Sequence, residues 1–148
     1  MKTGWNVWRV GALGCGLTAL LLILGSVWIA YKIARTPEMQ GFVAESLKCR
    51  KQMTEIHAAL GRYEAINRGY PTELSDLVPE YLADFKIFHC PAATDPSEEV
   101  SYSYVRPDHG TPDDAIVLTC EHHRLPNGEG LSLCVRKDGG FANQRTVR

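Results

Sequence analysis

Cysteine and histidine are the residue types in this chain best suited to chemistry, and a dense run of them begins at Cys120. The run Cys120-Glu121-His122-His123 places thiol and imidazole groups close together, and Cys134 follows it. Thiolates and imidazoles are the ligands that zinc prefers in proteins. On a regular strand, Cys120 and His122 would share one face. Cys120, His122 and Cys134 are therefore the candidate zinc ligands.

Disulfide bonds are the favoured interpretation of the same cysteines. Four of the five cysteines lie well after the N-terminal segment: Cys49, Cys90, Cys120 and Cys134. An even set in a small domain is typical of an oxidising compartment, whereas the spacing matches no standard zinc pattern. Cys120 and Cys134 could pair across two strands, and Cys49 and Cys90 could tie a helix to a sheet. Four cysteines allow three pairings, so the connectivity stays open.

Catalysis and calcium binding are less favoured. Near Cys90 and Cys120, nothing at a recognisable spacing supplies the orienting group or oxyanion hole that a nucleophilic thiol needs. Asp108, Asp113 and Asp114 could surround a calcium ion, but their spacing does not reproduce a calcium loop. We therefore predict that the protein is not an enzyme and has no cofactor, with calcium or zinc as minor alternatives.

An apolar segment precedes all of these groups. Residues 10–31 are 22 residues without a charge, and aromatic residues lie near both ends. In a helix this length reaches about 33 Å, enough to cross the hydrocarbon layer of a membrane. The alternative is a cleaved secretory signal, whose apolar core would be shorter. We expect a cytoplasmic N-terminus at 1–9 and one transmembrane helix at 10–31.

Charge and cysteine content disagree about the side of the membrane on which the remaining residues lie. The net charge of −1 conceals an asymmetry, because the chain from Glu38 onward carries 12 basic and 17 acidic residues. The basic residues of this part are dispersed and form no stripe, so the charge pattern does not predict binding to nucleic acid. Basic residues just after the apolar segment weakly favour a cytoplasmic domain, whereas the even cysteine set favours an oxidising compartment. We predict a single-pass protein of the inner membrane with its C-terminal domain periplasmic or extracellular.

A long amphipathic helix is predicted next. Proline disfavours helix in the residue before it, so Pro37 predicts a break, and residues 32–41 are interpreted as a juxtamembrane linker before a domain at 42–148. Apolar residues then recur at spacings of four and three, with Ser46 and Cys49 completing the pattern. Gly69 suits the left-handed position that ends the helix. The helix presents an interaction stripe, which consists of Phe42, Met53, Ile56, Leu60 and Tyr63.

Short elements follow the long helix. A brief helix is expected from a cap at Thr72 to a stop at Pro79. Alternating or apolar runs predict strands at 85–88, 100–105, 115–120 and 131–135, and Asp138-Gly139 predicts a tight turn. The sequence therefore predicts an α+β domain in which a long N-terminal helix packs on a small antiparallel β-sheet.

Several short motifs occur in a recognisable order along this domain. They are Cys49 early in the helix, Tyr63 and Asn67 near its end, Gly69-Tyr70-Pro71, Leu74 and Leu77, then Phe88-His89-Cys90-Pro91 and Asp138-Gly139. Together they resemble the type IV pilin and type II secretion pseudopilin family, most of all its major-pseudopilin branch and bacterial prepilin-like proteins. The resemblance covers roughly residues 40–141. The prepilin cleavage motif, a Phe-Thr pair followed by a glutamate, has no counterpart around Gly11 and Gly14.

The resemblance implies a pilin-like fold and a membrane-anchored structural protein that acts in assembly or scaffolding at the bacterial cell envelope. Its partners would be membrane lipid, other pilin-like or secretion-system proteins, and a second copy of the chain. One alternative is a true type II secretion pseudopilin or minor pilin incorporated in a filament. Another is a metal-binding or ligand-sensing ectodomain.

Overall fold

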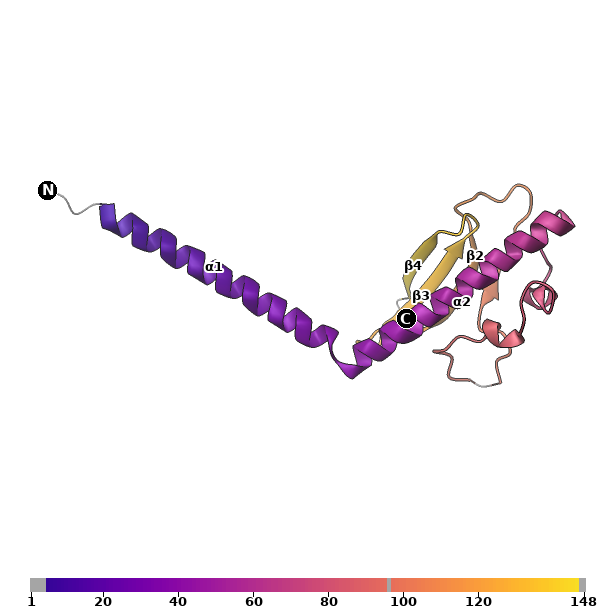
Figure 1. Ribbon diagram of the computed structural model, residues 1–148, viewed down its shortest axis with the longest axis horizontal. Coiled ribbons are helices and arrows are strands. Elements are labelled where there is room, and N and C mark those ends of the chain that lie inside the picture. The colour runs from indigo at the N-terminus through magenta and orange to yellow at the C-terminus, as the bar shows by residue number, and fades with distance from the viewer. Residues whose placement is uncertain (1–4, 96, 147–148) are drawn as a thin grey trace. The chain divides into compact units, whose positions relative to one another are not determined.

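Figure 1 shows the computed structural model, which describes residues 5–95 and 97–146, with side chains described from Thr18 to Arg145 apart from Pro96. The chain divides into two compact units, residues 1–40 and 41–148. Residues 1–4 of the predicted cytoplasmic N-terminus lie outside the described residues. The side chains of 5–17, which include the first part of the predicted span, are likewise not described.

The first unit is built on helix α1, Trp5–Ala34. Large apolar side chains of this helix are exposed from Leu20 to Ile33. At its C-terminal end, Lys32 Nζ lies 5.5 Å from the centre of the Trp28 ring. Within the described side chains, no single helix has the length and hydropathy of a membrane span. Thr18–Ala34 and Pro37–Asn67, separated by a short break, meet that test as a pair.

Helix α2, Pro37–Asn67, begins at the proline that predicts the break. Proline is well suited to a first helical turn, where its missing N–H costs no hydrogen bond. The break itself is only Arg35 and Thr36, so much of the predicted linker at 32–41 is helical. Met53, Ile56 and other stripe residues are buried along one face. The predicted amphipathic helix is therefore confirmed, with an earlier start.

The end of α2 differs by one residue from the prediction. Arg68, and not Gly69, adopts the left-handed conformation, with φ 57°. The reason is that the helix stops at Asn67, so Arg68 is the next residue. The Asn67 amide donates to the Tyr63 carbonyl and to Tyr81 Oη, both at 3.0 Å, and so fixes this end of the helix.

Two short 3₁₀ helices follow: η1, Leu74–Leu77, and η2, Phe85–Phe88. Glu73 and Asp76 cap η1 reciprocally, in place of the predicted cap at Thr72. The strand predicted at 85–88 is wrong. Asp84 accepts a hydrogen bond from the Lys86 N–H at 3.0 Å and starts a helical turn, which still buries Phe88 in the core.

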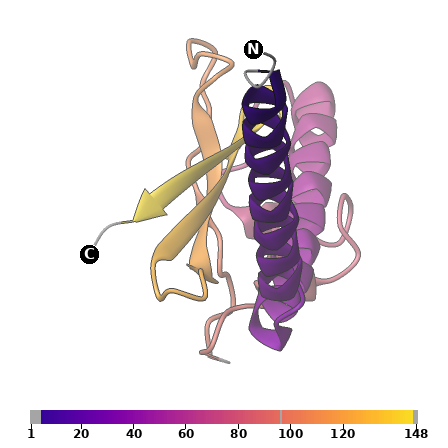
Figure 2. The same ribbon diagram turned by 90° about the vertical axis from the view of Figure 1, so that its left-hand side faces the viewer.

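In the part of the chain that the structure describes, four strands form an antiparallel sheet in the order β1-β2-β3-β4. Figure 2 shows the orange and yellow strands of this sheet from one end of the molecule. They are β1, Ser103–Tyr104; β2, Ile116–Arg124; β3, Gly130–Arg136; and β4, Phe141–Thr146. The strands predicted at 115–120 and 131–135 are confirmed, the run at 100–105 contributes only β1, and β4 is not predicted. Gly139, with φ +83°, makes the turn from β3 to β4 that Asp138-Gly139 predicts.

One hydrophobic core joins α2, both 3₁₀ helices and the sheet, and Figure 1 shows α2 lying along the sheet. Met53, Ile56 and Leu60 of the stripe are central members of this core. They are therefore covered inside the domain, which is the packing that a long helix lying on a small sheet predicts for the stripe. The α+β class with an antiparallel sheet is confirmed.

Candidate metal centre

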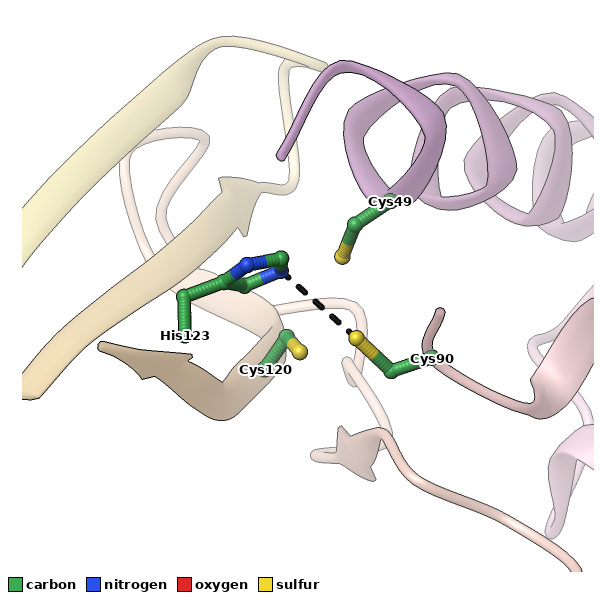
Figure 3. Close-up of side chains that lie close together, drawn as sticks. All are labelled: Cys49, Cys90, Cys120 and His123. Atoms are coloured by element: carbon green, nitrogen blue, oxygen red, sulfur yellow. Dashed lines mark hydrogen bonds between the residues drawn. The ribbon is translucent and has the colours of Figure 1, made fainter. Parts of the chain in front are cut away.

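Four side chains from three parts of the domain meet inside the core (Figure 3). Cys49 comes from α2, Cys90 follows η2, and Cys120 and His123 come from β2. Their three sulfurs and a ring nitrogen of His123 all lie within 4.8 Å of one another. The cysteines are 0% exposed and His123 is 1% exposed. We call these four residues the thiol–imidazole cluster.

A bulge in β2 brings Cys120 and His123 to the same side of the sheet. Cys120 pairs with Leu133 and His123 pairs with Leu131, so a step of three residues on β2 matches a step of two on β3. Residues three apart on a regular strand face opposite sides, and one extra residue reverses this. His123 is thus a member of the cluster that period-two reasoning misses, because it places His122 inward instead.

His122 and Cys134, two of the three predicted zinc ligands, lie outside the cluster. His122 Nε2 is 2.9 Å from Glu98 Oε2, and its Nδ1 is 3.8 Å from Cys120 Sγ. Cys134 pairs with Thr119, the residue before Cys120, so it faces the opposite side of the sheet from Cys120. Only Cys120 of the predicted set belongs to the site.

The disulfide candidates Cys49, Cys90, Cys120 and Cys134 are all free thiols in the structure. Cys120 and Cys134 face opposite sides of the sheet, an orientation that does not permit a bridge. Cys49 and Cys90 do bring helix and sheet region together, but no bond joins them. Within the described residues, the structure thus replaces two expected bridges with one cluster of reduced thiols and a separate cysteine.

Polar hydrogens surround the sulfurs of the cluster. The Ala92 N–H donates to Cys90 Sγ at 3.4 Å, across the turn that follows Cys90. Tyr102 Oη lies 3.7 Å from Cys49 Sγ and also donates to Gln52 Oε1 at 3.0 Å. Donors of this kind stabilise negative charge on sulfur. The Ala92 N–H therefore contributes to lowering the pKa of Cys90, and the Tyr102 hydroxyl contributes a lowering effect on the pKa of Cys49.

The imidazole of His123 is held from α2. Its Nε2 lies 3.6 Å from Cys90 Sγ, and its Nδ1 lies 3.4 Å from Ser46 Oγ. The Phe42 ring packs edge-on against it, with ring centres 6.4 Å apart. Ser46 is the polar residue within the helical spacing that the apolar stripe follows, and its contact with His123 accounts for a polar side chain there. The hydroxyl contacts one ring nitrogen, and the other ring nitrogen faces the sulfurs.

The three thiols change one another's acidity. Hydrogen bonds from Cys120 and Cys49 lower the pKa of Cys90, so the thiolate is favoured there. A hydrogen bond involving Cys120 lowers the pKa of Cys49, but the larger combined effect of Cys90 and burial raises it to about 12. Donation to Cys49 and Cys90, together with burial, raises the pKa of Cys120. A negative charge at Cys90 in the core would attract a cation.

The candidate calcium loop is engaged in other contacts. Asp108 Oδ1 accepts a hydrogen bond from Thr111 Oγ1 at 2.8 Å, and Asp113 Oδ1 lies 3.1 Å from Lys137 Nζ. Asp114 is exposed. The structure therefore does not gather Asp108, Asp113 and Asp114 around a common point, and solvated turn residues describe them best.

Comparison of the chain with protein family models, with characterised proteins and with solved structures finds no match in any of the three. The resemblance to the pilin and pseudopilin family therefore stays a prediction from motif order and spacing.

Proposed function

We propose that the protein is a membrane-anchored structural protein of pilin-like architecture, acting in assembly or scaffolding at the bacterial cell envelope. The exposed apolar surface of α1 carries this proposal. Its large apolar side chains between Leu20 and Ile33 are 51–75% exposed. Leaving so much contiguous apolar surface in water is unfavourable, and contact with lipid tails removes it from water.

A non-enzymatic role is supported by the burial of the reactive groups. Cys90 and His123 form the closest thiol–imidazole contact, at 3.6 Å, but both are almost fully buried. A nucleophilic thiol must meet its substrate, and no substrate reaches a group enclosed by core side chains. The packing of α2 along an antiparallel sheet suits a structural module of the kind that the pilin resemblance implies.

Extraction of membranes with alkaline carbonate tests the anchor. The full chain is expected to stay in the membrane pellet. Leu22→Arg places a charge within the apolar segment, at a cost of about 3 kcal/mol near a bilayer centre, and should increase the share of the chain in the carbonate supernatant. Leu47→Arg is the matched control, because Leu47 is an exposed leucine of α2. Recovery of the unaltered chain in the carbonate supernatant would overturn the proposal.

The side of the membrane needs its own test. A periplasmic or extracellular domain is what the pilin resemblance implies, although the free thiols withdraw the disulfide argument for it. Asn127→Cys places a thiol in the exposed turn between β2 and β3. A membrane-impermeant maleimide should label it in cells with a permeabilised outer envelope, whereas labelling only after lysis would place the domain in the cytoplasm.

Intact mass separates a permanent anchor from a filament subunit. We expect the full-length mass, because the prepilin cleavage motif has no counterpart in this sequence. Loss of a leader that ends at Gly11 or Gly14 would favour the alternative of a true type II secretion pseudopilin or minor pilin.

A further inference from the structure

We propose that Cys49, Cys90, Cys120 and His123 bind one zinc ion in a closed structural site. This inference goes beyond the proposed function and does not depend on it. Three thiolates and one imidazole are a standard ligand set for structural zinc. The four side chains come from three segments far apart in the sequence and meet in the interior of the domain (Figure 3).

The spacing of the ligand atoms fits a single tetrahedral ion. With the usual Zn–S and Zn–N lengths, tetrahedral geometry sets a sulfur and a nitrogen about 3.5 Å apart, and two sulfurs about 3.8 Å apart. Cys90 Sγ and His123 Nε2 are 3.6 Å apart. All four ligand atoms lie within 4.8 Å of one another, which leaves room for one ion and not for a multi-iron cluster.

Zinc is the ion that this donor set selects. Sulfur-rich ligands disfavour magnesium and calcium, which prefer oxygen, and a tetrahedral arrangement of thiolate and imidazole is characteristic of zinc. The protein supplies all four ligands, and each is buried. No coordination position is left for water or a substrate, so the ion has a structural and not a catalytic role.

The surroundings of the ligands complete the site. Ser46 Oγ contacts His123 Nδ1 and can accept a hydrogen bond from it, which fits the tautomer whose Nε2 lone pair faces the sulfurs. Metal-bound histidines commonly engage their second ring nitrogen in this way. The Ala92 N–H approaches Cys90 Sγ, and Tyr102 Oη approaches Cys49 Sγ. These contacts offset the net negative charge of three thiolates around a divalent ion.

A bound ion would cross-link the domain. It would join α2 through Cys49, the turn after η2 through Cys90, and β2 through Cys120 and His123. Closing such loops restricts the unfolded chain, as disulfides do. A domain of this size buries a smaller fraction of its surface than a larger one, so a cross-link adds useful stability. The ion would supply that cross-link in place of the disulfides that the sequence predicts.

Metal analysis of the purified full-length chain in detergent, without chelators, tests the proposal. We expect about one zinc per chain by mass spectrometry of the elements. Cys90→Ser and His123→Gln should each reduce the zinc content to background. The matched controls Cys134→Ser, at a buried cysteine outside the cluster, and His109→Gln, at an exposed histidine, should keep it at the level of the unaltered chain.

Cobalt provides a second measurement that does not require a variant to fold. Replacement of zinc by Co²⁺ in the unaltered chain should give thiolate-to-cobalt charge-transfer absorption and the intense visible bands of a tetrahedral site. Three results would overturn the proposal: zinc retained by Cys90→Ser, a cobalt spectrum without thiolate bands, or a metal-free native chain in which two of Cys49, Cys90 and Cys120 are joined as a disulfide.

Discussion

The two faces of the sheet hold cysteines of equal burial in different surroundings. Cys120 on β2 and Cys134 on β3 are both 0% exposed. Cys120 faces two other thiols and an imidazole, whereas the neighbour of Cys134 is the Thr119 hydroxyl, 3.9 Å from its sulfur. The pKa of Cys134 is raised mainly by burial, and that of Cys120 mainly by the neighbouring thiols. Convergence of ligands, and not burial, distinguishes the candidate site.

Removing each of these cysteines should give the largest contrast. Cys120→Ala deletes a proposed ligand, so zinc should be lost, together with the stability that it provides. That stability is about 4 kcal/mol when free zinc is a thousandfold above its dissociation constant. Cys134→Ala deletes a side chain of the same size from the other face and should cost only about 1 kcal/mol.

Chemical denaturation followed by circular dichroism, with zinc content measured in parallel, checks this pair. Equal losses of stability in Cys120→Ala and Cys134→Ala, with unchanged metal content in both, would remove the distinction between the two faces.

The two faces of α2 should differ by nearly as much. Ile56 is 0% exposed in the core and Ile66 is 71% exposed on the same helix. Ile56→Ala should lower the unfolding free energy by about 2–5 kcal/mol, because it deletes buried methyl groups and leaves a cavity. Ile66→Ala should change it by less than about 0.5 kcal/mol. Thermal and denaturant unfolding measure the unfolding free energy of both variants. An unchanged unfolding free energy in Ile56→Ala would show that this face of α2 does not pack in the core.

A smaller effect is expected from the residue that orients the imidazole. Ser46→Ala removes the contact with His123 Nδ1 but leaves all four ligands in place. Loss of such a supporting contact typically weakens metal binding by about 10–100-fold. Competition with a chromophoric chelator measures the affinity. Thr54→Ala is the control, because its hydroxyl contacts only the Arg50 carbonyl on the exposed side of α2; an equal loss there would mean that Ser46 has no specific role.

The smallest effect should come from two tyrosines that are close in sequence. Tyr102 Oη lies near Cys49 Sγ, and Tyr104 Oη donates to the Pro71 carbonyl at 3.1 Å. Tyr102→Phe and Tyr104→Phe should each cost about 1 kcal/mol of stability through a lost hydrogen bond. Only Tyr102→Phe should also lower zinc affinity. A weaker affinity in Tyr104→Phe would show that metal binding responds to general loosening of the domain.

Sequence reasoning predicts the elements with strong periodicity and misses those that depend on tertiary contacts. The spacing of Met53, Ile56 and Leu60 predicts α2, and Asp138-Gly139 predicts the turn after β3, since both signals are local. The run at 85–88 reads as a strand, yet Asp84 starts a helical turn that buries Phe88 equally well. A short apolar run does not distinguish these two solutions.

The sequence offers zinc at the candidate site only as a minor alternative to disulfides, and with other members. It names Cys120 and a neighbouring imidazole as candidate ligands, but the bulge in β2 exchanges His122 for His123. The sequence analysis pairs Cys49 with Cys90 only as a possible disulfide and does not predict that they are metal ligands. Their meeting with Cys120 depends on how α2 packs against the sheet, and spacing along the chain carries no direct signal of that packing.

X-ray absorption at the zinc edge of the purified full-length chain tests the central claim most directly. The account predicts a first shell of about three sulfurs near 2.3 Å and one nitrogen near 2.0 Å. A chain that contains no zinc, or a first shell made of oxygen and nitrogen alone, would contradict it.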